Sequence, residues 1–139
     1  FSAVFVNFYL YKKLYGLSGV DSITVNALLK KMDLERKVQF QNGGFTDLNL
    51  STGQRKRLAL TVAMLEDRPI YVFDEWAAEQ DVHFRQFFYE EILPELKSRG
   101  KTIIAVTHDE RFWRLADRVV KLDRGRVEWS RPGRDWNGQ

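Results

Sequence analysis

The sequence predicts an α/β fold in which a small helical region precedes a layer of alternating strands and helices. From Pro69 onward, short apolar runs alternate with segments of helical periodicity, which is typical of a mostly parallel sheet. Before that point, apolar residues recur at helical spacing instead. With 139 residues and 44% hydrophobic content, the chain can form one core and is too short for two ordinary domains.

Composition excludes several classes of protein. The formal net charge of +3 is far from the dense positive field of a dedicated nucleic-acid binder, so no nucleic-acid partner is expected. The chain has no cysteine and only 2 histidines, which argues against disulfides and a zinc site and fits a reducing, cytosolic location. No apolar run approaches the roughly 20 residues that span a bilayer. We therefore expect a soluble segment, and its start at Phe1 suggests a piece of a longer chain.

The first half is predicted to be mainly helical. Residues 1–6 form a short apolar strand, which we expect to pair with something that precedes it. Residues 10–36 follow helical spacing, and residues 41–44 form a loop. Ser51 or Thr52 can cap a further helix that ends near residues 67–69. The apolar stripe of the earlier helical region is formed by Val25, Leu28, Leu29 and Met32.

The second half alternates strands with helices. The predicted strands cover residues 70–73, 102–106, 119–122 and 127–129, and the predicted helices cover residues 82–96 and 110–115. Pro94 lies inside the first of these helices, where a missing amide hydrogen should kink or split it.

Two carboxylates stand at the end of the strand over residues 70–73. Its four apolar residues show no alternation, so the strand should be buried on both faces. Ligands of open α/β sheets bind outside the carboxyl ends of such strands. Asp74 can hold Mg²⁺ there through its waters, and Glu75 can orient or deprotonate an attacking water. Alternatively, Asp74 only caps the next turn and Glu75 is solvated.

The run Leu50 to Gln54, L-S-T-G-Q, begins the capped helix. A helix start with two hydroxyls and a glycine is an anion site, because free amide groups and the positive dipole end point at the ligand. Ser51 can donate a hydrogen bond, and Gly53 allows close backbone approach. The alternative is an ordinary amphipathic helix with Arg55, Lys56 and Arg57 in water.

His108 follows the strand over residues 102–106. An imidazole at this edge can donate to a phosphate oxygen or to the attacking water, although such a histidine can also be a turn residue. His83 has no such neighbours and is predicted to be a surface residue. The run Gly100-Lys101-Thr102 is no P-loop, because Glu95 stands where that motif needs glycine.

The L-S-T-G-Q run, the Asp74-Glu75 pair and the strand that leads to His108 follow one another in the chain in the same order as in ATP-binding-cassette (ABC) proteins. They resemble the nucleotide-binding domain of that family, over most of the chain up to about Trp129. The resemblance implies a RecA-like P-loop NTPase core, a partly parallel sheet with an inserted α-helical ABC subdomain. Residues 8–65 would be the helical subdomain with the signature, and residues 66–130 the second half of the core. Residues 131–139 would be a polar tail. The Walker A part is missing from this chain and would lie upstream of Phe1.

The resemblance also assigns roles to single residues. The signature that binds nucleotide would comprise Ser51, Thr52, Gly53 and Gln54. The metal and catalytic positions would be the Walker B Asp74, the catalytic base Glu75 and the switch histidine His108. Asp81 would be the D-loop aspartate beside the nucleotide.

The chain departs from the family pattern at three places. Thr52 replaces the first of two signature glycines. The Q-loop glutamine is absent near Val6, and Asn7 is a candidate surrogate for its amide toward the metal. The D-loop over residues 76–81 has a sequence that is unusual for the family. Together with residues 65–70 and 88–96, this sequence resembles that of bacterial exporters of cyclic peptides, siderophore precursors and microcin-type peptides.

The family implies ATP and Mg²⁺ as cofactors, and ATP hydrolysis that drives export. The implied partners are a second nucleotide-binding domain, in a head-to-tail homodimer, and a transmembrane domain of the same parent chain. The domain would then lie at the cytoplasmic face of the bacterial inner membrane, and this chain alone would be inactive. The alternative function is a soluble ABC-class ATPase of DNA repair or translation, which needs no membrane partner.

Overall fold

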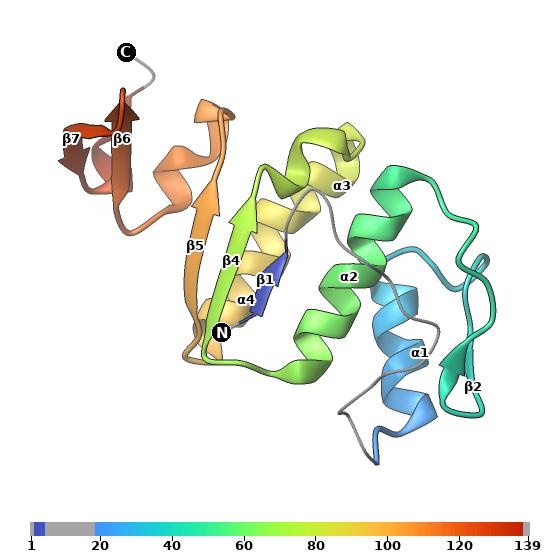
Figure 1. Cartoon of the computed structure of the whole chain (residues 1–139). Helices are drawn as coiled ribbons and strands as arrows, with labels where there is room; N and C mark the ends of the chain where they lie inside the picture. Colours follow the sequence, from blue (N-terminus) through green and yellow to red (C-terminus); the bar gives the residue numbers. More distant parts are fainter. Residues whose placement is uncertain (1, 5–18, 138–139) are drawn as a thin grey trace.

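The computed structural model describes residues 2–4 and 19–137, and its elements follow the predicted order (Figure 1). The strands are β1 (Ser2–Val4), β2 (Phe40–Gln41), β3 (Gly44–Phe45), β4 (Ile70–Asp74), β5 (Thr102–Val106), β6 (Val119–Asp123) and β7 (Arg126–Arg131). The helices are α1 (Ser22–Lys31), α2 (Thr52–Glu66), α3 (Val82–Phe87) and α4 (Leu93–Ser98), with a π turn η2 (Phe88–Ile92) between the last two. Short 3-10 helices are η1 (Trp76–Glu79), η3 (Glu110–Leu115) and η4 (Gly133–Asp135).

A parallel sheet in the order β1-β4-β5 forms the centre of the molecule. The opening segment is a strand, as predicted, but its partner comes later in the chain: Ser2 is in register with Tyr71 and Val4 with Phe73. Helix α2 packs beside β1, and α4 packs against β5 (Figure 1). The predicted parallel layer is thus present, with the end of β4 at its middle.

Helix α2 has clear start and stop signals. Ser51 is its N-cap, and Ser51 and Gln54 form a capping box in which each side chain bonds the other's backbone amide. Asp67 ends the helix in the left-handed conformation, with φ of 49°. The predicted helix and its end are therefore confirmed.

Helix α1 and the hairpin β2–β3 make up the described part of the helical front. Val25, Leu29 and Met32 are fully buried, as the apolar stripe predicted. The loop predicted at residues 41–44 is a tight hairpin turn, in which Asn42 and Gly43 both adopt positive φ, as such two-residue turns require. The amide of Asn26 bonds both backbone groups of Phe40 and joins the helix to the hairpin.

Residues 82–98 form one continuous helical run with the π turn in its middle. The amide of Leu93 bonds the carbonyl of Phe88, five residues back. Pro94 follows directly, and its position explains the wide turn, because proline lacks the amide hydrogen that an α-helix would use there. The predicted disturbance is present as a π turn within an unbroken helix.

An aromatic cluster fills the space between this helix and β4. The indole of Trp76 stacks on Phe88 with ring centroids 4.3 Å apart, and Phe73 meets Phe88 edge to face at 5.1 Å. Phe84 closes the cluster at 6.1 Å from Trp76. All four rings are buried, so the turn after β4 rests on a packed core.

The chain ends in the antiparallel hairpin β6–β7, which forms a sheet of its own. Residues 131–139 were expected to be a polar tail, yet the described part of this segment is packed. Trp136 stacks on Trp129 and touches Trp113, and the Arg131 guanidinium lies 4.0 Å from the Trp129 ring. The difference comes from Trp136, whose large apolar ring packs against two other indoles although the rest of the segment is polar.

In the part of the chain that the structure describes, no helix is both long enough and apolar enough to cross a membrane.

Candidate functional site

Glu75 stands at the turn after the central strand. Its φ of 44° and ψ of 32° place it in the left-handed region, which is costly for a residue with a side chain. Its amide donates to the carbonyl of Val106 at 3.1 Å, so the end of β4 is tied to the end of β5. The Glu75 side chain is 45% exposed.

His108 meets Glu75 across these two strand ends. Its Nε2 atom lies 3.0 Å from the Glu75 Oε1 atom, although the residues are 33 positions apart in the sequence. The His108 side chain is 89% exposed, so one of its faces stays open to a ligand. The sequence predicted both residues for one site, and the fold brings them together because β4 and β5 are parallel neighbours.

Asp74 ends β4 beside this pair and is half-buried. Within the described residues, no hydrogen bond or ion pair occupies its carboxylate. A single free carboxylate fits Mg²⁺, which keeps most of its waters and binds proteins through one or two carboxylates plus phosphate oxygens. Asp74 therefore fits the predicted metal position. Asn7, the candidate surrogate for the Q-loop amide, lies outside the described residues.

The signature segment begins helix α2, and its geometry suits an anion. The Ser51 hydroxyl accepts a hydrogen bond from the Gln54 amide at 3.3 Å, which leaves its own hydrogen free to donate. Thr52 and Gly53 occupy the first helical turn, where amide groups have no partner within the helix. These features fit a phosphate, as the sequence predicted.

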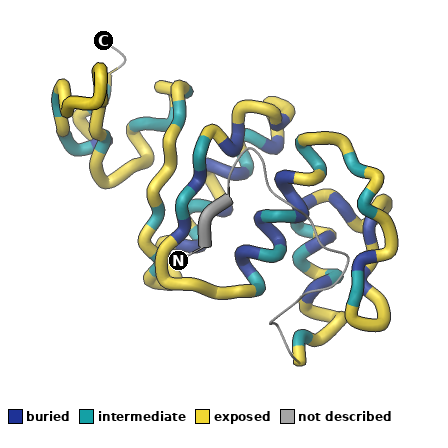
Figure 2. Tube along the Cα trace, viewed as in Figure 1, coloured by how far each residue is buried: buried dark blue, intermediate teal, exposed yellow. Residues whose placement is uncertain are grey.

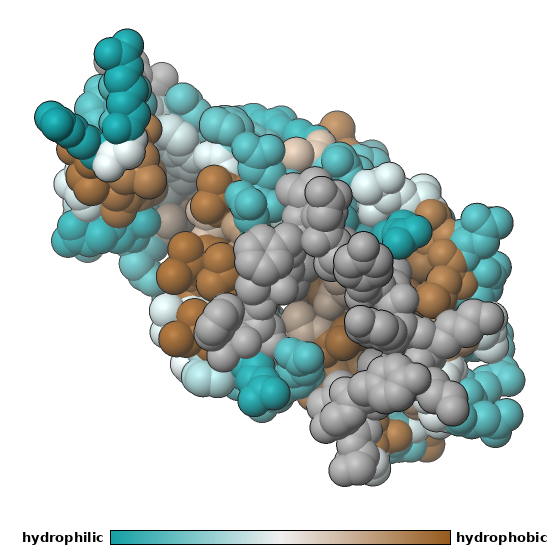
Figure 3. Space-filling view, in the orientation of Figure 1, coloured by the Kyte–Doolittle hydropathy of each residue, from teal (hydrophilic) through white to brown (hydrophobic). Residues whose placement is uncertain are grey.

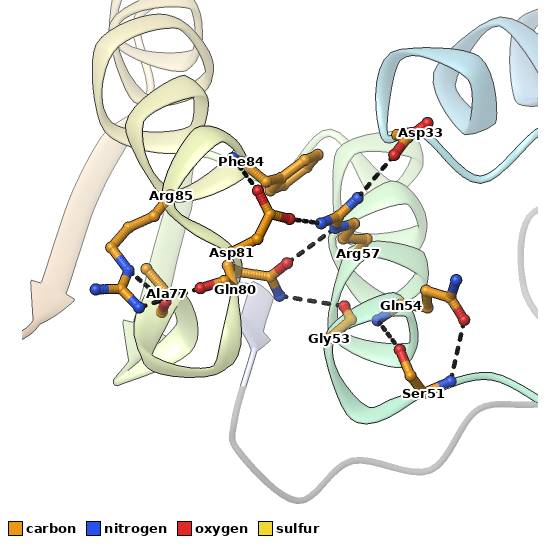
Figure 4. A network of polar contacts seen from close by, with 10 residues as sticks. All are labelled: Asp33, Ser51, Gly53, Gln54, Arg57, Ala77, Gln80, Asp81, Phe84 and Arg85. Atoms are coloured by element: carbon orange, nitrogen blue, oxygen red, sulfur yellow. Dashed lines mark hydrogen bonds and ion pairs between the residues drawn. The ribbon is translucent and has the colours of Figure 1, made fainter.

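Gly53 has a second constraint that the sequence did not reveal. A Cβ atom at this position would lie 3.1 Å from the Glu79 carbonyl oxygen and 3.6 Å from the Gln80 side chain. The Gln80 amide donates to the Gly53 carbonyl at 3.1 Å (Figure 4). Helix α2 and the segment Trp76–Asp81, which we call the 76–81 turn, approach each other closely here because Gly53 lacks a side chain.

Lys56 and Arg57 are buried, contrary to the alternative that placed them in water. Lys56 is 1% exposed; its Nζ atom donates to the Glu75 carbonyl at 3.4 Å and lies 3.5 Å from the Glu79 carboxylate. Arg55 alone of the three basic residues is exposed. Burying long charged side chains this way requires partners, and the 76–81 turn supplies them.

Arg57 joins α2 to the end of this turn (Figure 4). It donates to the Gln80 side chain at 2.8 Å and to the Asp81 carboxylate at 2.6 Å, and its guanidinium lies 3.7 Å from the Phe84 ring centroid. Sequence reasoning missed this role. The signal was present, because Arg57 shares one helical stripe with the buried residues Leu60, Thr61 and Met64.

Asp81 caps α3 and pairs with Arg57 in the same chain. Its carboxylate accepts from the Phe84 amide at 2.9 Å. That bond, with the nearby Arg57 guanidinium, holds the pKa of Asp81 below its usual range. Asp81 thus ends the 76–81 turn and connects it to α2 through Arg57, and its place beside the nucleotide stays a prediction. His83, predicted to be a surface residue, is exposed.

The site thus has two parts with a linker between them. One part is the group of Asp74, Glu75 and His108 at the strand ends, and the other is the start of α2. The 76–81 turn joins them, because Lys56 of α2 contacts both the Glu75 carbonyl and the Glu79 carboxylate, and Gln80 donates to the Gly53 carbonyl. A half-buried carboxylate, a glutamate in contact with a histidine and a capped helix start are together the features expected of an α/β domain of the class that binds nucleotide phosphates.

Comparison with solved structures agrees with this class. The chain superimposes on the ATP-binding cassette MJ0796, described as a dimeric post-hydrolysis state bound to ADP and phosphate, with a TM-score of 0.73 and 23% identity. The match covers 96% of this chain and 64% of that one. A metal-chelate-type ABC transporter in an inward-facing conformation gives a TM-score of 0.68 at 14% identity, over 96% of this chain and 58% of that one. The fold is therefore that of ABC ATPase domains.

Similar sequences carry the comparison further. The chain is 50% identical over 129 residues to the ATP-binding protein SyrD of Pseudomonas syringae pv. syringae, covering 90% of this chain and 23% of that protein. It is 33% identical to the sn-glycerol-3-phosphate import ATP-binding protein UgpC of Vibrio cholerae, over 90% of this chain and 36% of that one. No protein-family model matches. The chain belongs to the ABC family and corresponds to part of its ATP-binding domain.

Proposed function

We propose that the protein to which this chain belongs binds and hydrolyses ATP, with Glu75 as the general base. The observation that carries the proposal is the 3.0 Å contact between Glu75 and His108 at the ends of adjacent parallel strands, beside the Asp74 carboxylate, which has no hydrogen-bond or ion-pair partner among the described residues. A general base must lie within hydrogen-bond reach of the water it activates and must be oriented by a partner. The Glu75 side chain is exposed enough to reach a water molecule, and His108 is the partner that orients it.

The residues of the site would have separate tasks in this scheme. Asp74 would hold Mg²⁺ through its waters, and the bound metal would neutralise charge on the phosphates. Glu75 would orient and deprotonate the attacking water. His108 would keep the Glu75 carboxylate in place and donate to a phosphate oxygen. Ser51 and the amides of Thr52 and Gly53 would bind phosphate at the start of α2. The P-loop predicted upstream of Phe1 would supply the remaining phosphate contacts.

We further propose that two such domains assemble head to tail, so that the start of α2 of one subunit faces the P-loop of the other. The chain supports this arrangement by separating its two phosphate-directed parts with the well-packed 76–81 turn. The similarity to an ATP-binding cassette described as dimeric is a second argument. ATP would then be held between subunits.

The energy of hydrolysis would drive transport across the bacterial inner membrane, through a transmembrane domain of the parent chain. The chain spans 23% to 37% of the length of SyrD, UgpC and a Nod factor export ATP-binding protein of Rhizobium etli, which is 35% identical over 86% of this chain. These names include both import and export. We favour export of a cyclic peptide or siderophore precursor, because residues 76–81 and 88–96 resemble exporters of that type. The relatives named here give no support to the alternative in DNA repair or translation.

One experiment tests both parts of the proposal. Glu75→Gln in the full-length protein, in inside-out membrane vesicles, should bind ATP normally and lose hydrolysis by about a hundredfold or more, since the base is removed. Wild-type vesicles should accumulate a cyclic peptide only when ATP is supplied. Measurements are phosphate release, nucleotide binding and peptide uptake.

The matched control is Glu91→Gln, which changes an exposed glutamate on the π turn to the same amide. It should leave all three measurements unchanged. Undiminished hydrolysis by Glu75→Gln would contradict the assigned role of Glu75. Stimulation by DNA ends or ribosomes, without peptide uptake, would favour the soluble alternative.

A further inference from the structure

The 76–81 turn is held by an arginine that takes no part in the site described above. Arg85 comes from α3, and its side chain is 25% exposed. Its Nε atom donates to the Ala77 carbonyl at 3.1 Å, and its Nη2 atom donates to the Gln80 carbonyl at 3.1 Å (Figure 4). The Nη2 atom also donates to the Ala78 carbonyl at 3.2 Å. One guanidinium therefore fixes the turn that directly follows Glu75, by bonding its backbone.

The same guanidinium also reaches the turn that carries His108. The Arg85 Nη1 atom lies 3.7 Å from the Asp109 carboxylate, which is 17% exposed. Asp109 is itself held, because its amide donates to the Thr107 hydroxyl at 3.0 Å and its carboxylate accepts two bonds from Arg111. The Tyr89 hydroxyl donates to Thr107 at 2.9 Å and adds a further link to the helical run.

Glu75 and His108 each depend on the turn that bears them. Glu75 is in a costly left-handed conformation, so its neighbours must maintain it. His108 is 89% exposed and has little side-chain packing of its own, so the backbone of residues 107–109 sets its position. A misplacement of about 1 Å in such a site can cost about a hundredfold in rate.

We propose that Arg85 is a positioning residue for hydrolysis, which holds the turn after Glu75 and the turn of His108 at a fixed distance from each other. The inference rests on the proposed role of Glu75 as general base. Arg85 touches neither the reacting atoms nor the phosphate-directed helix start. It acts through the backbone of the 76–81 turn and through Asp109. The planar fork of arginine is needed, because the compact ammonium group of lysine cannot bond three carbonyls and also lie beside the Asp109 carboxylate.

The test uses the full-length protein with Arg85→Met, Arg85→Lys, Asp109→Asn and the double variant Arg85→Met/Asp109→Asn. Arg85→Met should lower kcat for ATP hydrolysis about tenfold to a hundredfold, with KM for ATP changed less than about threefold. Arg85→Lys should recover part of that loss. The effects of Arg85→Met and Asp109→Asn should be non-additive, because the two residues act as one unit.

The matched control is Arg99→Met, which removes the arginine that directly follows the same helical run and pairs with Asp67 at 2.6 Å, beside the opposite ends of β4 and β5. It should leave kcat within about twofold of wild type. A loss of thermal stability in Arg85→Met with kcat per folded molecule unchanged would overturn the proposal, as would additive effects in the double variant.

If Arg85→Met does not fold, Arg85→Lys and Asp109→Asn still decide, since unchanged kcat in both contradicts positioning. Glu75→Gln is measured in parallel. Hydrolysis by Glu75→Gln at the wild-type rate would remove the proposed function itself. An inactive Glu75→Gln variant together with a fully active Arg85→Met variant would contradict only the proposed role of Arg85.

Discussion

Two regions of the described chain, residues 25–96 and residues 101–137, differ sharply in how well they are packed. Every buried hydrophobic residue that the structure describes lies between Val25 and Leu96, in the helical front, β4 and the helical run after it (Figure 2). From Lys101 to Asn137, Gly133 is the one buried residue among those described. Apolar side chains of this region face outward, with Leu122 66% and Ile104 53% exposed. Figure 3 shows hydrophobic surface gathered over β5.

This difference shows where the site depends on packing within this chain and where it does not. Glu75 belongs to the packed region, since Lys56 donates to its carbonyl, the next residue Trp76 is buried and Arg85 donates to the turn that follows. His108 belongs to the open region and is connected to the core mainly through Tyr89, Arg85 and its contact with Glu75. We expect the missing Walker A part of the ATPase domain to cover the exposed apolar side of β5.

The largest effect is expected from Trp76→Ala in the packed region. Trp76 is 1% exposed, stacks on Phe88 and donates from its indole to the Lys56 carbonyl at 3.2 Å. Its removal should lower the free energy of unfolding by about 3–5 kcal/mol, because it leaves a large cavity. Urea denaturation followed by circular dichroism measures this change. Trp136→Ala, in the half-buried cluster at the other end, should cost no more than about 2 kcal/mol; equal losses would contradict the comparison.

A smaller effect should appear at low pH, where the two regions can be distinguished. The pKa of Asp81 is held low by the Phe84 amide and Arg57, and that of Asp109 is held low by Arg111 and Arg85. Both carboxylates therefore stabilise the fold above an ordinary aspartate pKa of about 4, and this stability is lost as the pH falls through their lowered pKa values. The urea concentration at the midpoint of unfolding should thus decrease as the pH is lowered below about 4.

Comparison of two amide variants then locates the effect. Asp81→Asn should flatten the pH dependence of global unfolding, because Asp81 joins α2 and α3 in the packed region. Asp109→Asn should change the global midpoint less and act mainly on hydrogen exchange near residues 107–109. The opposite ranking would show that the turn of His108 belongs to the same folding unit as the core.

The smallest effect is expected from Leu122→Ser on the hairpin β6–β7. In this chain the free energy of unfolding should change by less than about 0.5 kcal/mol, since Leu122 is largely exposed. In the full-length protein the same change should cost about 1–2 kcal/mol if another part of the ATPase domain covers this face. Equal values in both proteins would mean that the hairpin stays uncovered.

The sequence predicted well what local chemistry decides. The unbroken apolar run before Asp74, the cap at Ser51 and the strand before His108 are all present, because each depends on neighbours along the chain. The partner of β1 was not predictable, since strand pairing is decided by the whole sheet. Arg85 and Lys56 were missed for a similar reason: their partners are backbone carbonyls, which every residue has and no motif marks.

The π turn before Pro94 explains how one side of the helix stays in contact with the core. The buried residues Phe84, Phe88, Ile92 and Leu96 follow a strict repeat of four. In a regular α-helix of 3.6 residues per turn, each step of four rotates the side chain by about 40° too far. One wide turn unwinds much of that excess and returns the later residues to the same azimuth. The single wide turn therefore keeps a repeat of four residues in phase with the helix over its whole length. Tyr89, which lies in this wide turn, donates to Thr107 beside His108.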